Sequence, residues 1–342
     1  MAEKEFGDII TQDSEMKKVL QLAHNIAPSR ASVLICGESG TGKELLAKFI
    51  HNRSPRAKNR FVAVNCAAVP ENLLESELFG YEKGAFTGAN TTKPGKFEIA
   101  NNSTFLLDEI TEMPILLQAK LLRVIQEGEV ERLGAKQPMK INVRLIATTN
   151  RNLAEMVQRG EFRADLYYRL NVIPLVIPPL KNRKRDIEIL ARFFLGVSGI
   201  VNNKENKSLQ AESIQKLLSW NWPGNVRELE NVIERSVLLS TSNLIGPEEI
   251  HINGFEQLQQ KTFDFTPGMT LAEVEKQLIL KTLEHTGYNR TRAAQILDIS
   301  IRTLRNKLHE YHFVSPVAES EPEIQVDKTP EINPISLRGG YG

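Results

Sequence analysis

The chain has 342 residues, enough for two or three domains, and its 41% hydrophobic and 25% charged residues are typical of a soluble globular protein. Lys and Arg (43) balance Asp and Glu (42), so the net charge of +1 gives no information about a partner, and any nucleic-acid signal has to be local. Two cysteines are too few for a disulfide framework. The N-terminus lacks the apolar segment of a secretory signal, and no apolar run is long enough to span a membrane. We therefore expect a cytoplasmic protein with no membrane partner.

Short apolar runs alternate with helix-compatible segments over residues 6–179. The strand-like runs are "SVLICG" (32–37), "RFVAVN" (60–65), "STFLLDE" (103–109) and "NVRLIATTN" (142–150), and segments such as "KELLAKFIHNRS" follow them. This alternation predicts an α/β fold in which a parallel sheet carries helices on both faces. Prolines at positions 174, 178 and 179 predict the end of this region.

Pattern and composition divide the chain into five parts. Residues 1–180 are predicted to form the α/β region, residues 181–251 a smaller helical subdomain, and residues 269–313 an all-α unit. Residues 252–268 lack a clear period and predict a linker. Residues 314–342 contain four prolines and few bulky apolar side chains, which predicts a disordered tail.

A phosphate-binding loop is predicted where the first strand-like run ends. The segment "GESGTGKE" matches G-x-x-x-x-G-K between a strand and a helix, the context that this motif requires. Its residues are Gly37, Glu38, Ser39, Gly40, Thr41, Gly42, Lys43 and Glu44. Its backbone N–H groups can converge on phosphates at a helix N-terminus, and Lys43 can reach the β- and γ-phosphates. Glu44 stands where Ser or Thr usually ligates Mg²⁺, so the metal has to depend on another carboxylate.

The segment "GAFTGA" follows, with glycines around a Phe and a Thr. Its residues are Gly84, Ala85, Phe86, Thr87, Gly88 and Ala89. Glycine is unfavourable inside helices and strands, so the segment predicts a loop that carries an aromatic ring.

Two acids end the strand-like run "TFLLDE". Asp108 could hold Mg²⁺, directly or through water, and Glu109 could orient and polarise the water that attacks the γ-phosphate. The alternative is a pair of acids that caps the next helix, but the upstream phosphate loop favours hydrolysis. Asn150 ends another strand-like run, where it could reach the γ-phosphate, and Asn65 ends "RFVAVN", but either Asn could merely cap a turn.

The C-terminal unit is predicted to contain three helices. Thr270 and Glu273 form a capping box for the first helix, and Gly287 can end it. A short helix at residues 291–297, a turn at Asp298 and a second helix capped by Ser300 indicate a helix-turn-helix.

Basic residues gather in this helix-turn-helix. Between residues 289 and 308 the chain has five basic residues, Arg290, Arg292, Arg302, Arg305 and Lys307, against one acid, Asp298. Local basicity of this kind favours DNA binding over a dimerisation module. The candidates for base-edge or phosphate contacts on the second helix are Arg302, Thr303, Arg305 and Asn306.

Five motifs occur together in one order: "GESGTGKE", "GAFTGA", "FLLDE", "FRADLYYRL" and "WPGNVRELEN". With them the chain resembles bacterial enhancer-binding proteins, the sigma-54-dependent transcriptional activators of the AAA+ class, over about residues 6–313. The resemblance implies an AAA+ α/β ATPase subdomain, a small helical lid and a C-terminal Fis-type helix-turn-helix domain. Asp298 departs from this pattern, because the family often has Gly in the turn.

The resemblance also implies roles in ATP hydrolysis. Arg163 and Arg169 would act on the ATP of a neighbouring subunit. The alternative is that they are ordinary surface arginines that pair with Asp165 or Glu161. Arg227 matches the second sensor on the lid. Asn65 matches the residue that holds the catalytic Glu in check, and Asn150 lies near the first sensor, for which Thr148 and Thr149 are also candidates.

The implied partners are sigma-54 RNA polymerase holoenzyme, enhancer DNA and further copies of the chain. Rings, usually hexamers, would assemble from inactive dimers, and the GAFTGA loop would contact sigma-54 and remodel the closed promoter complex. A generic AAA+ remodelling enzyme and a DNA-binding repressor with a regulatory nucleotide site are the competing functions. Few residues precede the AAA+ region, so we expect either a truncated chain without its regulatory domain or control in trans.

Overall fold

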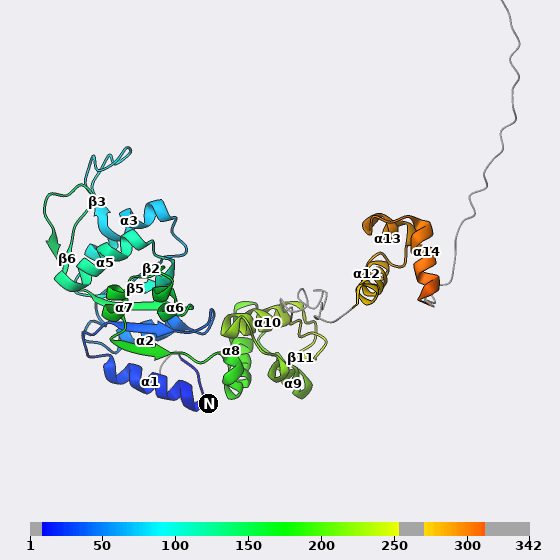
Figure 1. Ribbon diagram of the computed structural model, residues 1–342. Helices are drawn as coiled ribbons and strands as arrows, with labels where there is room; N and C mark the ends of the chain where they lie inside the picture. Colours follow the sequence, from blue (N-terminus) through cyan, green and yellow to red (C-terminus); the bar gives the residue numbers. More distant parts are fainter. Residues whose placement is uncertain (1–8, 253–269, 312–342) are drawn as a thin grey trace, which may run out of the picture. The chain divides into compact units, whose positions relative to one another are not determined.

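A computed structural model of the protein describes residues 9–252 and 270–311. Contacts divide the chain after residue 254 into two compact units (Figure 1). The described residues of the first unit form three hydrophobic clusters, and those of the second unit form one. Most of the predicted linker (from residue 253) and the predicted tail lie outside the described residues. Among the residues that are described, no helix has the length and hydropathy needed to cross a bilayer.

The first unit contains the predicted parallel sheet. Its five strands lie in the order β2-β5-β8-β1-β9, and every neighbouring pair is parallel. Their bounds are Val33–Cys36 (β1), Val62–Asn65 (β2), Thr104–Asp108 (β5), Arg144–Thr149 (β8) and Ile173–Val176 (β9). The prediction of a parallel sheet is therefore confirmed, with each predicted strand shortened by two or three residues.

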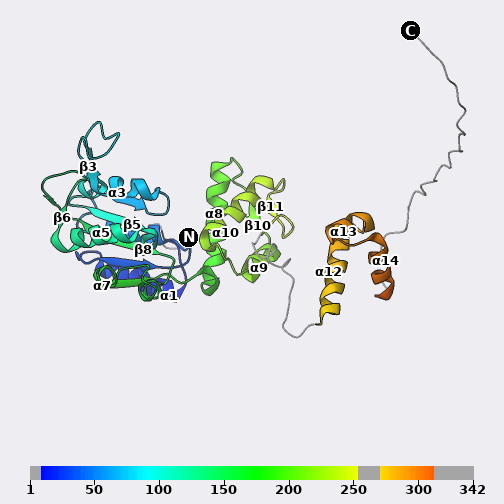
Figure 2. The same ribbon diagram turned by 45° about the horizontal axis from the view of Figure 1, so that its top comes forward.

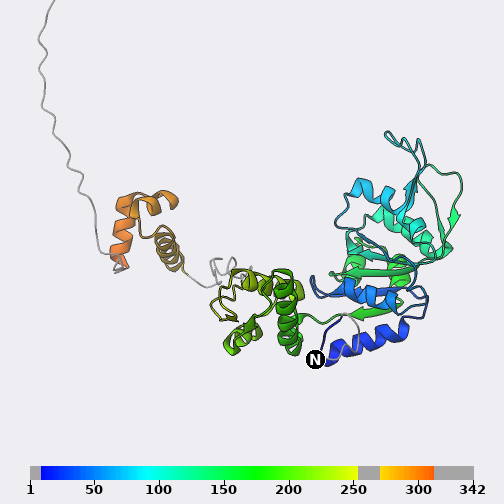
Figure 3. The same cartoon turned by 180° about the vertical axis from the view of Figure 1, so that it is seen from behind.

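The predicted covering of both sheet faces is also confirmed. Helices α1 (Ser14–Ile26) and α2 (Lys43–Asn52) cover one face (Figure 3). On this face Leu20, Ile35 and Ile146 lie in a shared core. The other face packs against helices whose bounds are Glu71–Phe79 (α3), Lys96–Ile99 (α4), Ile115–Glu127 (α5), Leu153–Gln158 (α6) and Ala164–Leu170 (α7). Alternate strand residues thus enter two different cores, as a sheet buried on both faces requires.

The strand β9 was not among the predicted strands, although it lies within the predicted α/β region of residues 1–180. Pro174 lies inside this strand, in register with Leu34 of β1. The strand is at the edge of the sheet, where hydrogen bonds are needed on one side only and a missing N–H is tolerated.

Two short antiparallel pairs project from the sheet. β3 (Gly80–Tyr81) pairs with β4 (Lys93–Pro94) and encloses the GAFTGA segment, whereas β6 (Glu129–Val130) pairs with β7 (Met139–Lys140). A bridge from Tyr81 to Leu133 joins the two projections, which extend away from the sheet in Figure 1. The GAFTGA loop is therefore supported by the segment between β6 and β7.

The predicted helical subdomain follows β9. It consists of α8 (Lys184–Val201), α9 (Ala211–Ser219), α10 (Asn225–Leu239) and a two-stranded pair of β10 (Ser208–Leu209) with β11 (Leu244–Ile245) (Figure 2). Its core contains the buried Trp222, and Leu229 and Ile233 of α10 pack there with residues of α8 and α9.

The second unit has the three predicted helices, α12 (Leu271–His285), α13 (Arg290–Ile296) and α14 (Ile301–Glu310). The capping box is confirmed: Glu273 N lies 3.3 Å from Thr270 Oγ1, and Thr270 N lies 2.8 Å from Glu273 Oε2. Asp298 has a φ of 52°, the left-handed geometry that Asp tolerates well. Ile279 and Leu283 of α12 are buried in the core of this unit, whereas Leu278 is exposed.

Candidate nucleotide site and DNA-binding surface

The predicted phosphate loop connects β1 to the N-terminus of α2, which begins at Lys43. The Lys43 side chain is only 6% exposed, because it folds back into the loop and its Nζ donates to the Gly37 carbonyl at 2.9 Å. The same Nζ lies 3.1 Å from Glu109 Oε1. The loop, its lysine and the predicted catalytic acid therefore meet at one place.

Glu109 is held in place by hydrogen bonds to Thr148 in β8 and to Asn150, the residue after β8. Its backbone has a φ of 52°, an unusual left-handed geometry for a long side chain. Its backbone N donates to Thr148 Oγ1 at 3.1 Å, and the Asn150 backbone N donates to Glu109 Oε2 at 3.1 Å. A strained residue held by several contacts is a common feature of functional sites.

Asp108 accepts hydrogen bonds from both sides. Thr148 Oγ1 donates to its Oδ1 at 2.5 Å, and Asn65 Nδ2 donates to its Oδ2 at 2.8 Å. Asn65 thus contacts Asp108 and has no hydrogen bond to Glu109 here, although the resemblance implies that it restrains Glu109. That restraining role stays a prediction.

These residues surround a cavity of about 450 Å³. The predicted residues that line it are Ser39, Gly40, Gly42, Lys43, Glu44, Asn65, Asp108, Glu109, Asn150 and Arg227. Within the described parts of the chain, no three His, Cys, Asp or Glu side chains form a complete metal site. One or two carboxylates together with substrate phosphates are what Mg²⁺ usually requires, so Asp108 beside a phosphate loop fits a nucleotide-bound Mg²⁺.

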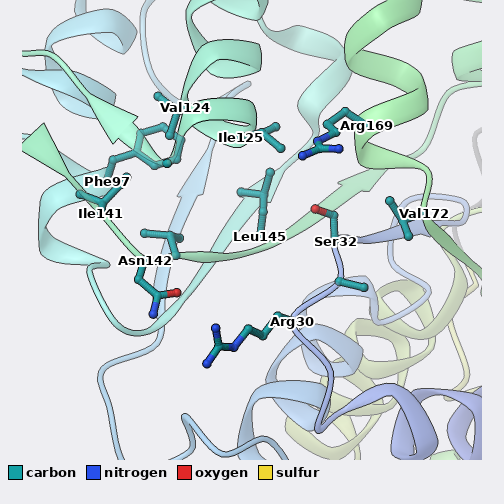
Figure 4. A pocket seen from close by; sticks show the side chains of 13 residues that line it. Arg30, Ser32, Phe97, Val124, Ile125, Ile141, Asn142, Leu145, Arg169 and Val172 are labelled. Atoms are coloured by element: carbon teal, nitrogen blue, oxygen red, sulfur yellow. The ribbon is translucent and has the colours of Figure 1, made fainter. Parts of the chain in front are cut away.

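The two predicted trans arginines lie outside this cavity. Arg163 Nη2 pairs with Asp165 Oδ2 at 2.7 Å, which is the surface pair that the sequence left open. Arg169 lines a different cavity of about 360 Å³ with Arg30, at the N-terminal ends of β1 and β8. Figure 4 shows both side chains at this cavity, with apolar residues such as Leu145 along it. Neither arginine lines the nucleotide cavity of its own copy, and Arg169 lies at the strand ends opposite the phosphate loop.

The GAFTGA segment forms the tip of the β3–β4 projection. Gly84 and Gly88 have φ values of 84° and 104°, which favour glycine. The Phe86 ring lies edge-on to the Tyr81 ring, with 5.0 Å between centroids, yet the residue remains 47% exposed. Thr87 is exposed and Ala89 is buried, so Phe86 and Thr87 are the accessible side chains at the tip.

Sequence reasoning missed Arg132, which lies between β6 and β7. Its guanidinium pairs with Glu98 of α4 and with Glu82, just before the GAFTGA segment. Glu98 and Glu82 are 34 and 50 positions away, and no motif marks the three residues as a group. Their proximity follows only from the folded arrangement of the two projections.

The predicted DNA-binding residues lie mostly at the surface of the second unit. Ser300 caps α14, because its Oγ accepts from Thr303 N at 3.0 Å. The exposed members of the predicted set are Arg292, Arg302, Thr303, Arg305 and Asn306, while Arg290 is half-buried. Lys307 Nζ lies 2.8 Å from Glu275 Oε2 of α12, so its charge is paired within the unit.

Comparisons with known proteins agree with this architecture. Family models described as "Sigma-54 interaction domain", "AAA+ ATPase lid domain" and "Bacterial regulatory protein, Fis family" match residues 9–176, 181–263 and 270–311. The chain is 51% identical over 318 residues to the transcriptional regulatory protein FlbD of Caulobacter vibrioides, covering 89% of this chain and 70% of FlbD. It is 49% identical over 314 residues to the regulatory protein AtoC of Escherichia coli, covering 90% of this chain and 68% of AtoC.

Solved structures show the same fold. The structure of NtrX from Brucella abortus in complex with ATP superposes with a TM-score of 0.68 at 30% identity, covering 89% of this chain and 69% of NtrX. Fold and site thus define a protein of the AAA+ P-loop class with a lid and a Fis-type helix-turn-helix. The chain belongs to the family of sigma-54-dependent transcriptional regulators.

Proposed function

We propose that the protein is an ATPase that acts as an oligomeric ring, binds enhancer DNA and remodels the closed promoter complex of sigma-54 RNA polymerase. The observation that carries this proposal is the position of Glu109, held 3.1 Å from the phosphate-loop Lys43 in a cavity that adjoins the lid. A water-activating carboxylate beside a phosphate loop has a role in hydrolysis that a purely regulatory nucleotide site does not require.

ATP binding is supported by the loop geometry and by the related NtrX, which was solved with ATP and with ADP. The loop amides and the α2 N-terminus would hold the phosphates, and Lys43 would neutralise the β- and γ-phosphates. Bound Mg²⁺, held by Asp108, would supply further charge neutralisation. Glu109 would polarise the attacking water. Asn150, which follows the last residue of β8, and Arg227 of the lid would sense the nucleotide.

A ring is supported by the location of the arginines. Arg163 and Arg169 lie outside the nucleotide cavity of their own copy, whereas a head-to-tail contact could bring them to the cavity of the next copy. Repetition of one such contact closes a ring, and we propose a hexamer formed from inactive dimers. Each arginine that reaches a transferring phosphoryl group contributes roughly 10³ to 10⁵ in rate in comparable enzymes.

Two further surfaces would bind the partners of the protein. Phe86 and Thr87, exposed at the tip of a projection, would contact sigma-54. The basic α14, with the residues preceding it, would bind enhancer DNA. In this division residues 1–180 and 181–251 hydrolyse ATP, and residues 269–313 bind DNA.

Two assays on one preparation test the proposal: ATP hydrolysis, and transcription from a sigma-54 promoter in vitro. We expect both activities, and we expect Glu109→Gln to retain ATP binding but to lose at least about 100-fold in turnover, because the amide cannot polarise water. Glu112→Gln is the matched control, since Glu112 lines the same cavity but pairs with Arg151. ATPase activity without transcription would instead support a generic remodelling enzyme, and DNA binding without ATPase activity would support a repressor.

A further inference from the structure

Asn225 connects the helical lid to the phosphate loop. It is the first residue of α10 and is 0% exposed. Its Nδ2 donates to Glu38 Oε2 at 3.0 Å and to the Ser39 carbonyl at 3.0 Å, both in the phosphate loop. Its Oδ1 accepts from Leu180 N at 2.7 Å, where the chain enters the lid. One buried amide therefore joins three segments and uses both of its N–H donors.

The lid backbone beside Asn225 is also in contact with the loop. Val226 N donates to the Gly40 carbonyl at 3.0 Å. A Cβ added to Gly40 would lie 2.3 Å from the Gly224 carbonyl oxygen, so only glycine permits this approach. The α10 N-terminus is thus packed directly on the loop whose amides are proposed to hold the phosphates.

Local structure fixes Asn225 in this position. Its φ of 53° is left-handed, a geometry in which Asn is several-fold enriched among residues other than Gly. The preceding turn is held by Glu228, which accepts from Gly224 N at 2.8 Å and from Trp220 Nε1 at 3.0 Å. The amide is therefore presented to the loop by a rigid turn.

We propose that Asn225 is a positioning residue of the phosphate loop: its two hydrogen bonds hold the loop in the shape that binds phosphates and make that shape depend on the lid. This inference rests on the proposed function, because it assigns a role at the same nucleotide site. Loss of the bonds leaves the Ser39 carbonyl and the Glu38 carboxylate without their buried partner, so the loop can rearrange at the cost of nucleotide affinity.

Two substitutions separate loop positioning from lid stability. Asn225→Gly removes the side chain while keeping a residue suited to positive φ, so it adds no backbone strain. Asn225→Asp keeps an oxygen that can accept from Leu180 N, but it loses both donors and places a second carboxylate beside Glu38. In the double variant Asn225→Asp with Glu38→Gln, the glutamine amide can donate to the aspartate, which restores the bond with reversed polarity.

The measurement is the Kd for ATP and ADP of the full chain, with Tm measured in parallel. We expect Asn225→Gly and Asn225→Asp to weaken ATP binding about tenfold, which corresponds to about 1.4 kcal/mol, and the double variant to recover part of the loss. The control is Ser236→Ala, which removes a buried hydroxyl that donates within the lid to the Val232 and Glu249 carbonyls, far along α10 from the loop. It should lower Tm but leave the Kd unchanged.

Wild-type affinity in both Asn225 variants would overturn the inference alone. The inference would also be overturned if Ser236→Ala weakened ATP binding as much as Asn225→Gly at an equal loss of Tm. It would likewise be overturned if the double variant recovered none of the lost ATP affinity. A wild-type protein that binds no ATP would overturn the proposed function together with the inference.

Discussion

Arg132 and Glu98 form a two-pronged ion pair, with Nε 2.7 Å from Oε1 and Nη2 2.6 Å from Oε2. The third nitrogen, Nη1, lies 2.8 Å from Oε1 of Glu82. Glu82 precedes the GAFTGA segment, and Glu98 follows it in α4. One guanidinium therefore ties the segment between β6 and β7 to both ends of the projection that carries Phe86. A planar fork is needed for this geometry, which favours Arg over Lys.

Removal of this guanidinium should uncouple ATP hydrolysis from sigma-54 binding. In Arg132→Ala the nucleotide cavity is untouched, so ATPase activity should stay within about threefold of the wild type, whereas the freed projection should lose most of its nucleotide-dependent binding to sigma-54. Arg132→Lys should recover little, because an ammonium cannot form the fork. Lys136→Ala, in the same segment, is the control. Equal loss of both activities in Arg132→Ala would contradict this coupling role.

The Glu98 pair should also make stability depend on pH. The hydrogen bond from Arg132 is the main cause that lowers the pKa of Glu98 below its ordinary value of 4.5. Because the folded pKa is the lower one, this stabilisation is complete above the unfolded pKa and disappears as pH falls through the folded pKa. Glu98→Gln should therefore cost roughly 2 kcal/mol of unfolding free energy at pH 7. The difference should shrink below pH 4.5, and a difference independent of pH would contradict the assignment.

Local sequence patterns were sufficient for several features of the site. The phosphate loop, the acids that end β5 and the capping box of α12 each depend on residues close together in the chain, where side-chain chemistry and spacing decide the conformation. The strand β9 was missed because Pro174 normally interrupts a strand, and its position at the sheet edge is a property of the whole sheet. Sequence patterning cannot indicate which strand lies at an edge.

Long-range contacts of the site were not predictable. Asn225 and Glu38 are 187 positions apart, and Arg132 and Glu98 are 34 apart. Each pair combines polar residues that are individually common at surfaces, so no periodicity or motif distinguishes them. The "GNVRELEN" segment did contain a signal, since an Asn after Gly can adopt left-handed geometry, but its partner depends on how the lid packs on the loop.

The arginine assignment predicts a site shared between copies. ATPase activity per subunit should rise with protein concentration as rings assemble, and Arg169→Ala should lower it by about 10³. A mixture of Arg169→Ala with Lys43→Ala should recover part of the activity, because some interfaces then join an intact phosphate loop to an intact arginine. Steady-state hydrolysis over a concentration series measures both effects. A concentration-independent rate without recovery in the mixture would exclude a shared site.

The second unit allows a contrast between two basic residues of α14. Arg302 is exposed, whereas Lys307 pairs with Glu275 at 2.8 Å. Arg302→Ala should weaken DNA binding and reduce the slope of log K against log salt by about 0.9, the value for one phosphate contact. Lys307→Ala should change the slope less and should lower Tm instead. DNA titrations at several salt concentrations distinguish the two, and equal slopes in wild type and Arg302→Ala would place the phosphate contact elsewhere.

Substitution of the exposed Phe86 tests directly whether the GAFTGA loop couples ATP hydrolysis to sigma-54 binding. Its ring touches Tyr81 but is half accessible at the projection tip, and it does not line the cavity that Lys43, Asp108 and Glu109 surround. Phe86→Ala should therefore keep ATP hydrolysis and ring assembly. It should abolish the binding of sigma-54 that an ATP transition-state analogue traps, and with it open-complex formation.

The proposed contact is small for one loop, so the proposal requires several loops to act together. One Phe contributes only about 1.5–3 kcal/mol when fully buried, too little for stable binding by a single loop. Several loops on the proposed ring would add avidity, so mixing Phe86→Ala with wild-type subunits should reduce sigma-54 binding progressively. Lys83→Ala, an exposed substitution in the same projection, is the control and should behave as wild type. ATPase activity and sigma-54 binding should be measured on one preparation. If Phe86→Ala loses both together, the projection is a structural part of the ATPase and does not contact sigma-54 as proposed.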